Sequence, residues 1–167
     1  MTTYWIPIWM AMTIAVSVPI EDKRITPLPA LDVMRGQNSF ATGPDIMVIR
    51  EPRGWASLWA SHMGGGLPNT AIPAPPVFDF DKVMIVAITG GETYPTGDYI
   101  YESGRAKGKN ALIRLRFEVA RQSATLLARP YAFFAVPRVE GEVVIETPTG
   151  ANGAWIEKKR FPKLGKN

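Results

Sequence analysis

The hydrophobic pattern of the chain centres on one apolar run, Lys82–Thr89 (KVMIVAIT). A half-exposed strand alternates apolar and polar side chains, whereas this run is apolar between its two ends, which is typical of a strand covered on both faces. Gly90 and Gly91 follow it, and then an aromatic stretch, Tyr99–Glu102. The pattern predicts a central strand, a turn completed near Gly97 and a returning strand.

Clean alternation follows at Ala111–Val119. One face carries apolar side chains and the other is mostly charged, which predicts an antiparallel strand with one solvated face. The apolar set is Ile113, Leu115, Phe117 and Val119, and the opposite set is Leu112, Arg114, Arg116 and Glu118. Shorter strands are predicted at 45–50, 123–128, 131–136 and 142–146, and a basic turn at 103–110.

One segment has helical periodicity, Trp55–Met63. Its large side chains recur at the spacing of one helix face, namely Trp55, Leu58, Trp59 and His62. We expect this face to pack on a sheet. Gly64–Gly66 should end the helix with a left-handed residue, and the proline-rich stretch 67–76 should be an extended surface connector.

The predicted fold class is mainly β: a small antiparallel β-sandwich or partly open barrel, with one short helix packed against it. The 15 glycines and 15 prolines favour turns and edge strands over long helices. We divide the chain into an apolar N-terminal segment (1–20), a linker (21–44), a β domain (45–147) and a basic C-terminal tail (148–167).

The N-terminal segment contains a run without charged side chains, Tyr4–Ile20. Three interpretations stay open. It is a signal peptide with a cleavage site at Ala15–Ser17, a short membrane span, or an apolar arm that packs on the domain or on a partner. A signal peptide or a membrane span predicts an extracytoplasmic protein, periplasmic or secreted. A segment that is retained predicts membrane contact through residues 4–20.

The amino-acid composition excludes several kinds of metal and catalytic site. The chain has no cysteine, which excludes disulfides, thiolate metal sites and a cysteine nucleophile, and its one histidine excludes a multi-histidine metal site within the chain. The net charge of +4 is modest for a nucleic-acid-binding protein. We therefore expect no metal, no cofactor, no nucleic-acid partner and no small-molecule substrate.

Two groups of residues are candidates for catalysis. His62 is the only histidine that a nucleophilic triad could use, but no G-x-S-x-G motif presents a serine to it. Asp79 and Asp81 would share one face of a strand, where paired carboxylates can work as acid and base. We interpret His62 as a structural histidine and the two acids as solvated turn residues, so no catalytic residue is predicted.

The candidate interaction surface is the hairpin that follows the central strand. Aromatic and arginine side chains dominate the energetics of protein interfaces, and this hairpin carries both. We expect exposed side chains of Tyr99, Tyr101, Arg105, Arg114 and Arg116 to form the contact, together with Pro95 and Thr96 in the preceding loop.

The order of motifs resembles the C-terminal domain family named after the protease-complex subunit PrcB. The similar segments are Gly54–His62 (GWASLWASH), Val77–Phe80, Gly90–Glu92, Pro95–Tyr99 (PTGDY) and Pro130–Arg138 (PYAFFAVPR). The family usually has a glycine where this chain has Asp98. The resemblance implies a small, mostly β domain of exported bacterial proteins that acts as an accessory to a larger assembly. It implies no catalytic residues.

A fainter resemblance concerns one loop. Pro95–Tyr99 is similar to a loop of the chagasin-like inhibitors of cysteine proteases, and Arg129–Tyr131 to another. The functional prediction is therefore a non-catalytic accessory subunit that docks onto a larger protein complex. The alternative is a protease inhibitor that acts through the Pro95–Tyr99 loop.

Overall fold

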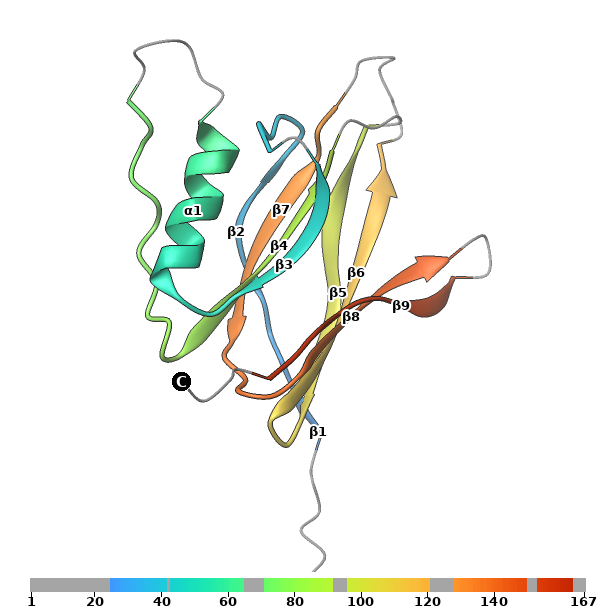
Figure 1. Ribbon diagram of the computed structural model, residues 1–167. Helices are drawn as coiled ribbons and strands as arrows, with labels where there is room; N and C mark the ends of the chain where they lie inside the picture. The colour runs from blue at the N-terminus through green and yellow to red at the C-terminus, as the bar shows by residue number, and fades with distance from the viewer. Residues whose placement is uncertain are drawn as a thin grey trace, which may run out of the picture.

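The computed structural model describes residues 25–41, 43–64, 71–91, 96–120, 128–149 and 153–163. Two β-sheets pack face to face, and a helix covers the outer face of one of them (Figure 1). Within these ranges there is one short helix and no closed barrel. The mainly β class and the sandwich architecture are thus confirmed.

The first sheet has five strands in the order β1-β5-β6-β8-β9. These are β1 (Ile25–Pro27), β5 (Gly97–Lys107), β6 (Asn110–Val119), β8 (Val143–Thr149) and β9 (Ala154–Phe161). All neighbours are antiparallel except β6 and β8, which are parallel over Ala111–Arg114. This one parallel pairing was not predicted.

The second sheet has four antiparallel strands in the order β2-β7-β4-β3. These are β2 (Leu31–Gly36), β7 (Tyr131–Pro137), β4 (Val83–Gly90) and β3 (Pro44–Ile49). Met84 and Val86 of β4 face the other sheet, and Ile85 and Ala87 face the helix; all four side chains are fully buried. The prediction of a central strand covered on both faces is confirmed.

The core between the sheets is formed by the side chains on the inward face of each strand. Ile113 and Leu115 of β6 pack there with Phe134 and Val136 of β7. The inward face predicted for this strand is correct except at its end, where Val119 is 51% exposed. There β6 extends beyond the buried part of the sandwich.

Helix α1 spans Pro52–Met63 and buries the four predicted side chains against the second sheet. Its end differs from the prediction. Gly64 is right-handed (φ −76°, ψ −5°), so a left-handed cap does not explain this glycine. A Cβ atom there would collide with the Ala60 carbonyl oxygen, so close approach of the backbone requires the glycine instead.

Two tryptophans of α1 hold the proline-rich connector along the helix. The Trp55 indole N–H donates to the Pro76 carbonyl at 2.8 Å, and the Trp59 indole N–H donates to the Pro73 carbonyl at 2.7 Å. Both rings are otherwise buried, so these bonds satisfy the one polar group that each ring brings into the core.

Replacing Trp59 by Phe should lower the free energy of unfolding by about 1 kcal/mol, because the Pro73 carbonyl loses its donor and some ring volume is lost. Urea denaturation measures the change. Trp155→Phe is a comparison without such a bond, since its half-buried ring contacts the Arg114 guanidinium instead. A Trp59→Phe protein as stable as the wild type would show that the bond contributes nothing.

Several segments expected to lie outside the domain are strands. Within the predicted linker (21–44), β1 pairs with β5 and β2 pairs with β7, and within the predicted tail (148–167), β9 pairs with β8. The basic turn predicted at 103–110 is also wrong, because β5 continues to Lys107 through a bulge after Tyr101. Only Gly108, with φ of +60°, and Lys109 form the turn.

Some expectations lie outside the described residues, namely those for 1–20 and for the predicted strand residues 123–127. Where the chain is described, no helix has the length and apolarity needed to cross a membrane.

Candidate functional site

The two tyrosines of the predicted interaction surface face inward. They pair with Phe117 and Leu115, whose side chains also face the space between the sheets. The Tyr101 hydroxyl donates to the Leu28 carbonyl at 2.7 Å, and burial raises the pKa of Tyr101 to about 12. The Tyr99 ring lies 4.9 Å from the Phe117 ring. The expectation of exposed aromatics beside arginines was therefore wrong.

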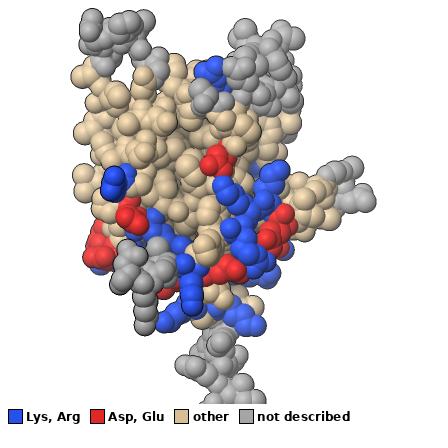
Figure 2. Space-filling view, viewed as in Figure 1, with Lys and Arg blue, Asp and Glu red and all other residues tan. Residues whose placement is uncertain are grey.

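The predicted arginines lie on the opposite, outer face of the sheet. Arg114 forms an ion pair with Glu146 at 2.9 Å and lies over the Trp155 ring, 5.0 Å from its centre. Arg116 pairs with Glu102 at 3.1 Å. Figure 2 shows blue and red side chains next to one another over the lower half of the molecule. Pairing within the sheet leaves this face little net charge with which to attract an acidic partner.

Arg105 is the exception on that face, because it is exposed and makes no ion pair with any residue in the described ranges. It remains a candidate contact residue by itself. The structure does not bring it together with the two tyrosines.

The loop assigned to protease inhibition is only partly described. Pro95 lies outside the described residues, and the Thr96 carbonyl accepts a hydrogen bond from Ala120 N–H at 2.9 Å. Gly97, Asp98 and Tyr99 are not loop residues, because they begin β5 and pair with β6. The turn predicted near Gly97 is therefore not at this residue, which is already part of a strand.

His62 is a buried structural residue. It is 2% exposed, its Nδ1 lies 3.0 Å from Ser39 Oγ, and its ring centre lies 4.2 Å from that of Tyr131. Asp79 is exposed and pairs with Lys82 at 2.7 Å. The turn that holds Asp79 lies near the start of α1, whereas His62 is in its last turn (Figure 1). These groups do not form one site.

Stability should depend on pH through His62, the only histidine. Burial lowers the pKa of His62 below its ordinary value of 6.5, so the unfolded chain binds a proton more readily than the folded one. Its contribution is complete above about pH 6.5 and is lost as pH falls toward the lower folded-state pKa. Urea denaturation at two pH values spanning this window should show the loss, and His62→Gln should reduce it. Equal pH dependence of both proteins would contradict the assignment.

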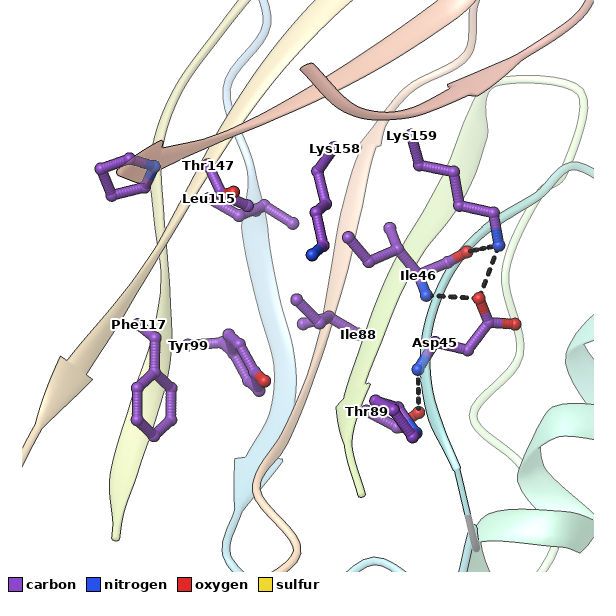
Figure 3. A pocket seen from close by; sticks show the side chains of 12 residues that line it. Asp45, Ile46, Ile88, Thr89, Tyr99, Leu115, Phe117, Thr147, Lys158 and Lys159 are labelled. Atoms are coloured by element: carbon purple, nitrogen blue, oxygen red, sulfur yellow. Dashed lines mark hydrogen bonds and ion pairs between the residues drawn. The ribbon is translucent and has the colours of Figure 1, made fainter. Parts of the chain in front are cut away.

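A cleft of about 500 Å³ opens between the sheets at one end of the sandwich. Its apolar surface includes Ile46 and Ile88 of the second sheet and Leu115, Phe117 and Tyr99 of the first. The remaining lining residues are Pro44, Asp45, Thr89, Thr147, Pro148, Lys158 and Lys159. Figure 3 shows these side chains converging from both sheets on one space.

Two lysines of β9 reach this cleft and differ in their partners. Lys159 Nζ donates to Asp45 Oδ1 at 2.5 Å and to the Ile46 carbonyl at 2.8 Å. Lys158 points into the cleft and has no ion pair with any residue that the structure describes. The cleft therefore combines an apolar interior with one cation available to a ligand.

Such a lining suits binding more than catalysis. Apolar walls with a few placed polar groups are what a binding pocket needs, and an anionic group would complement Lys158. The one carboxylate in the cleft, Asp45, already pairs with Lys159. Across the described ranges, no group of three His, Asp or Glu side chains could hold a metal ion.

Sequence reasoning missed this cleft because Lys158 and Lys159 were assigned to a tail. The aromatic and β-branched pair Trp155-Ile156 was a signal for a strand there. Comparison with known proteins adds no relative, since no family model, curated protein or solved structure matches the chain. The similarity to the PrcB-type domain stays a prediction.

Proposed function

We propose that this protein is a non-catalytic interaction domain that docks onto a larger protein assembly through the cleft between its sheets. The observation that carries the proposal is the cleft itself, in which an apolar lining surrounds Lys158, a cation with no ion pair to any described residue. Burial of that surface by a partner would supply the binding free energy, and Lys158 would select an anionic group on the partner.

The outer arginine face is a weaker candidate for the same role. Arg114 and Arg116 already have carboxylate partners, so a docking protein would have to replace those ion pairs. The cleft places a cation without a described ion-pair partner, Lys158, among apolar side chains from both sheets.

We also propose that the domain works outside the cytoplasm as an accessory subunit. Support comes from the uncharged run Tyr4–Ile20 and from the motif order shared with the PrcB-type domains. The intact mass of the protein from its native source tests the location, because it shows whether a signal peptide has been removed. A full-length mass recovered from the cytoplasmic fraction would contradict it.

Cross-linking followed by purification from native extract tests the docking proposal. We expect the wild-type chain to recover a larger complex and Lys158→Glu to recover at least roughly tenfold less, because the cleft then repels an anionic group. Lys109→Glu is the matched control, since it makes the same change of charge on an exposed turn that does not line the cleft.

Arg105→Glu separates the two candidate surfaces, because it alters the outer face and leaves the cleft intact. Loss of the complex with this variant alone would move the interface to the outer face. A wild-type chain that runs only as a free monomer would contradict the proposal as a whole.

A further inference from the structure

Strand β6 has an unpaired edge beside the cleft. It pairs with β8 only over Ala111–Arg114, and beyond Glu146 strand β8 pairs with β9 alone. Figure 1 shows β6 continuing upward while the β8–β9 hairpin turns away from it. On this side of Leu115–Val119, no strand in the described ranges pairs with β6.

Two hydrogen bonds show which residues of β6 direct their N–H and C=O groups to this edge. Ala111 N–H donates to Glu142 on the β8 side at 2.8 Å, and Ala120 N–H donates to Thr96 on the β5 side at 2.9 Å. Successive residues of a strand direct their N–H and C=O groups to opposite sides. Phe117 and Val119 therefore present both groups at the open edge, and Leu115 presents its C=O there, because the parallel pairing of Arg114 with Glu146 takes up the Leu115 N–H.

Neighbouring edges are protected against a further strand. At the outer edge of β3, Lys159 Nζ donates to the Ile46 carbonyl, and β9 carries four successive charged residues at 157–160. Where β8 leaves β6, Pro148 has no N–H to donate. Charged side chains and proline are the usual means by which proteins block strand addition. Leu115–Val119 has no proline, and its two charged side chains, Arg116 and Glu118, lie on the face away from the cleft and pair with each other at 3.5 Å.

The side chains at this edge also face the cleft, since Leu115 and Phe117 both line it. We propose that the partner docks by strand addition: an extended segment pairs with β6 at Leu115–Val119, places apolar side chains over the cleft and directs an acidic side chain at Lys158. This inference rests on the proposed function and specifies its partner as an extended peptide segment with alternating apolar residues and one acid.

Synthetic peptides test the inference with the full chain. In the probes, valine alternates with serine, and one valine at a time is replaced by glutamate. We expect the best probe to bind with roughly tenfold lower affinity to Lys158→Glu and with unchanged affinity to Lys109→Glu. Two sets of alternate probe amides can be N-methylated. Methylating the set that faces β6 should abolish binding, and methylating the other set should leave it unchanged, because only every second N–H of an added strand faces β6.

Amide hydrogen exchange of the protein supplies the second measurement. Bound probe should slow exchange at Phe117 and Val119, whose N–H groups face the open edge, and should leave Arg116 and Glu118 unchanged, because their N–H groups face β5. Absence of binding by every probe, or binding without this alternating protection, overturns the inference. Protection that appears without probe as protein concentration rises, together with a dimer mass, also overturns it, because the occupant is then a second copy.

Failure here is distinct from failure of the proposed function. If cross-linked complexes still depend on Lys158 while the β6 amides stay unprotected, the cleft is the docking site and strand addition is not the mode. If probes protect β6 but native extract yields only free monomer, strand addition stands and docking to a larger assembly fails.

Discussion

Replacing Phe133 by Ala should lower the free energy of unfolding by about 3–5 kcal/mol, the largest effect expected for a single truncation in this chain. Phe133 is fully buried in β7, which lies between β4 and β2. The Trp55 ring meets it edge-on with centroids 5.6 Å apart, and the His62 ring lies 4.9 Å away. The cavity would therefore separate the helix from its sheet.

Urea denaturation followed by circular dichroism measures the loss. Val77→Ala is the control, because Val77 is 96% exposed and its truncation should change stability by less than about 0.5 kcal/mol. A decrease below about 1 kcal/mol for the Phe133 variant would mean that the surrounding rings close the cavity, and that α1 depends little on this contact.

The elements predicted correctly are those whose burial is indicated by the hydrophobic periodicity of their own sequence. Strand β4 is apolar at consecutive positions because both of its faces are covered, and α1 repeats its large side chains at helical spacing because one face lies on the sheet. In each case a single segment carries the whole signal, so no knowledge of its neighbours is needed.

The elements missed are edge strands. The three residues of β1 are all exposed, and β2 and β9 are exposed or half-buried throughout, so none shows the alternation of a core strand. Their place in the sheets comes from pairing with β5, β7 and β8. Strand pairing depends on two segments, so it cannot be predicted from the hydrophobic pattern of one of them.

The candidate site was harder to predict than the edge strands, because it is formed by residues that are far apart in the sequence. Asp45 and Lys159, which meet at the cleft, are 114 residues apart in sequence. The sequence also could not show whether the side chains of Tyr99 and Tyr101 face the core or the solvent. Alternation places both on one face of the strand but does not tell which face is buried. Pairing with Phe117 and Leu115 decides this, and it moves the tyrosines from the predicted surface to the interior.

The two ends of the sandwich are built differently. At the end of β3, the Arg50 guanidinium links this strand to the segments that precede β8 and follow β9. At the beginning of the same strand, Pro44 and Asp45 line the open cleft. Hydrogen bonds therefore join the sheets at both ends of β3, because Lys159 of β9 donates to Asp45 and to the Ile46 carbonyl beside the cleft. These two links should keep the sheets in place when a ligand enters the cleft.

The second large effect is expected at Arg50. Its Nη2 donates to the Gly141 carbonyl at 2.8 Å and its Nη1 donates to the Pro162 carbonyl at 3.0 Å, and the side chain is 8% exposed. Arg50→Met keeps much of the volume and removes both bonds. Bonds from a charged donor contribute about 1.5–3 kcal/mol each.

Part of that loss is offset, because the charge itself is costly to bury. Burial first, and then the neighbouring Arg138, lower the pKa of Arg50, and its Nε has no hydrogen-bond partner. We therefore expect Arg50→Met to cost about 2–3 kcal/mol, less than two full bonds. Urea denaturation measures it against Arg53→Met, an exposed arginine at the start of α1. If the two variants are equally stable, the hydrogen bonds of Arg50 do not hold the two sheets together at the end of β3.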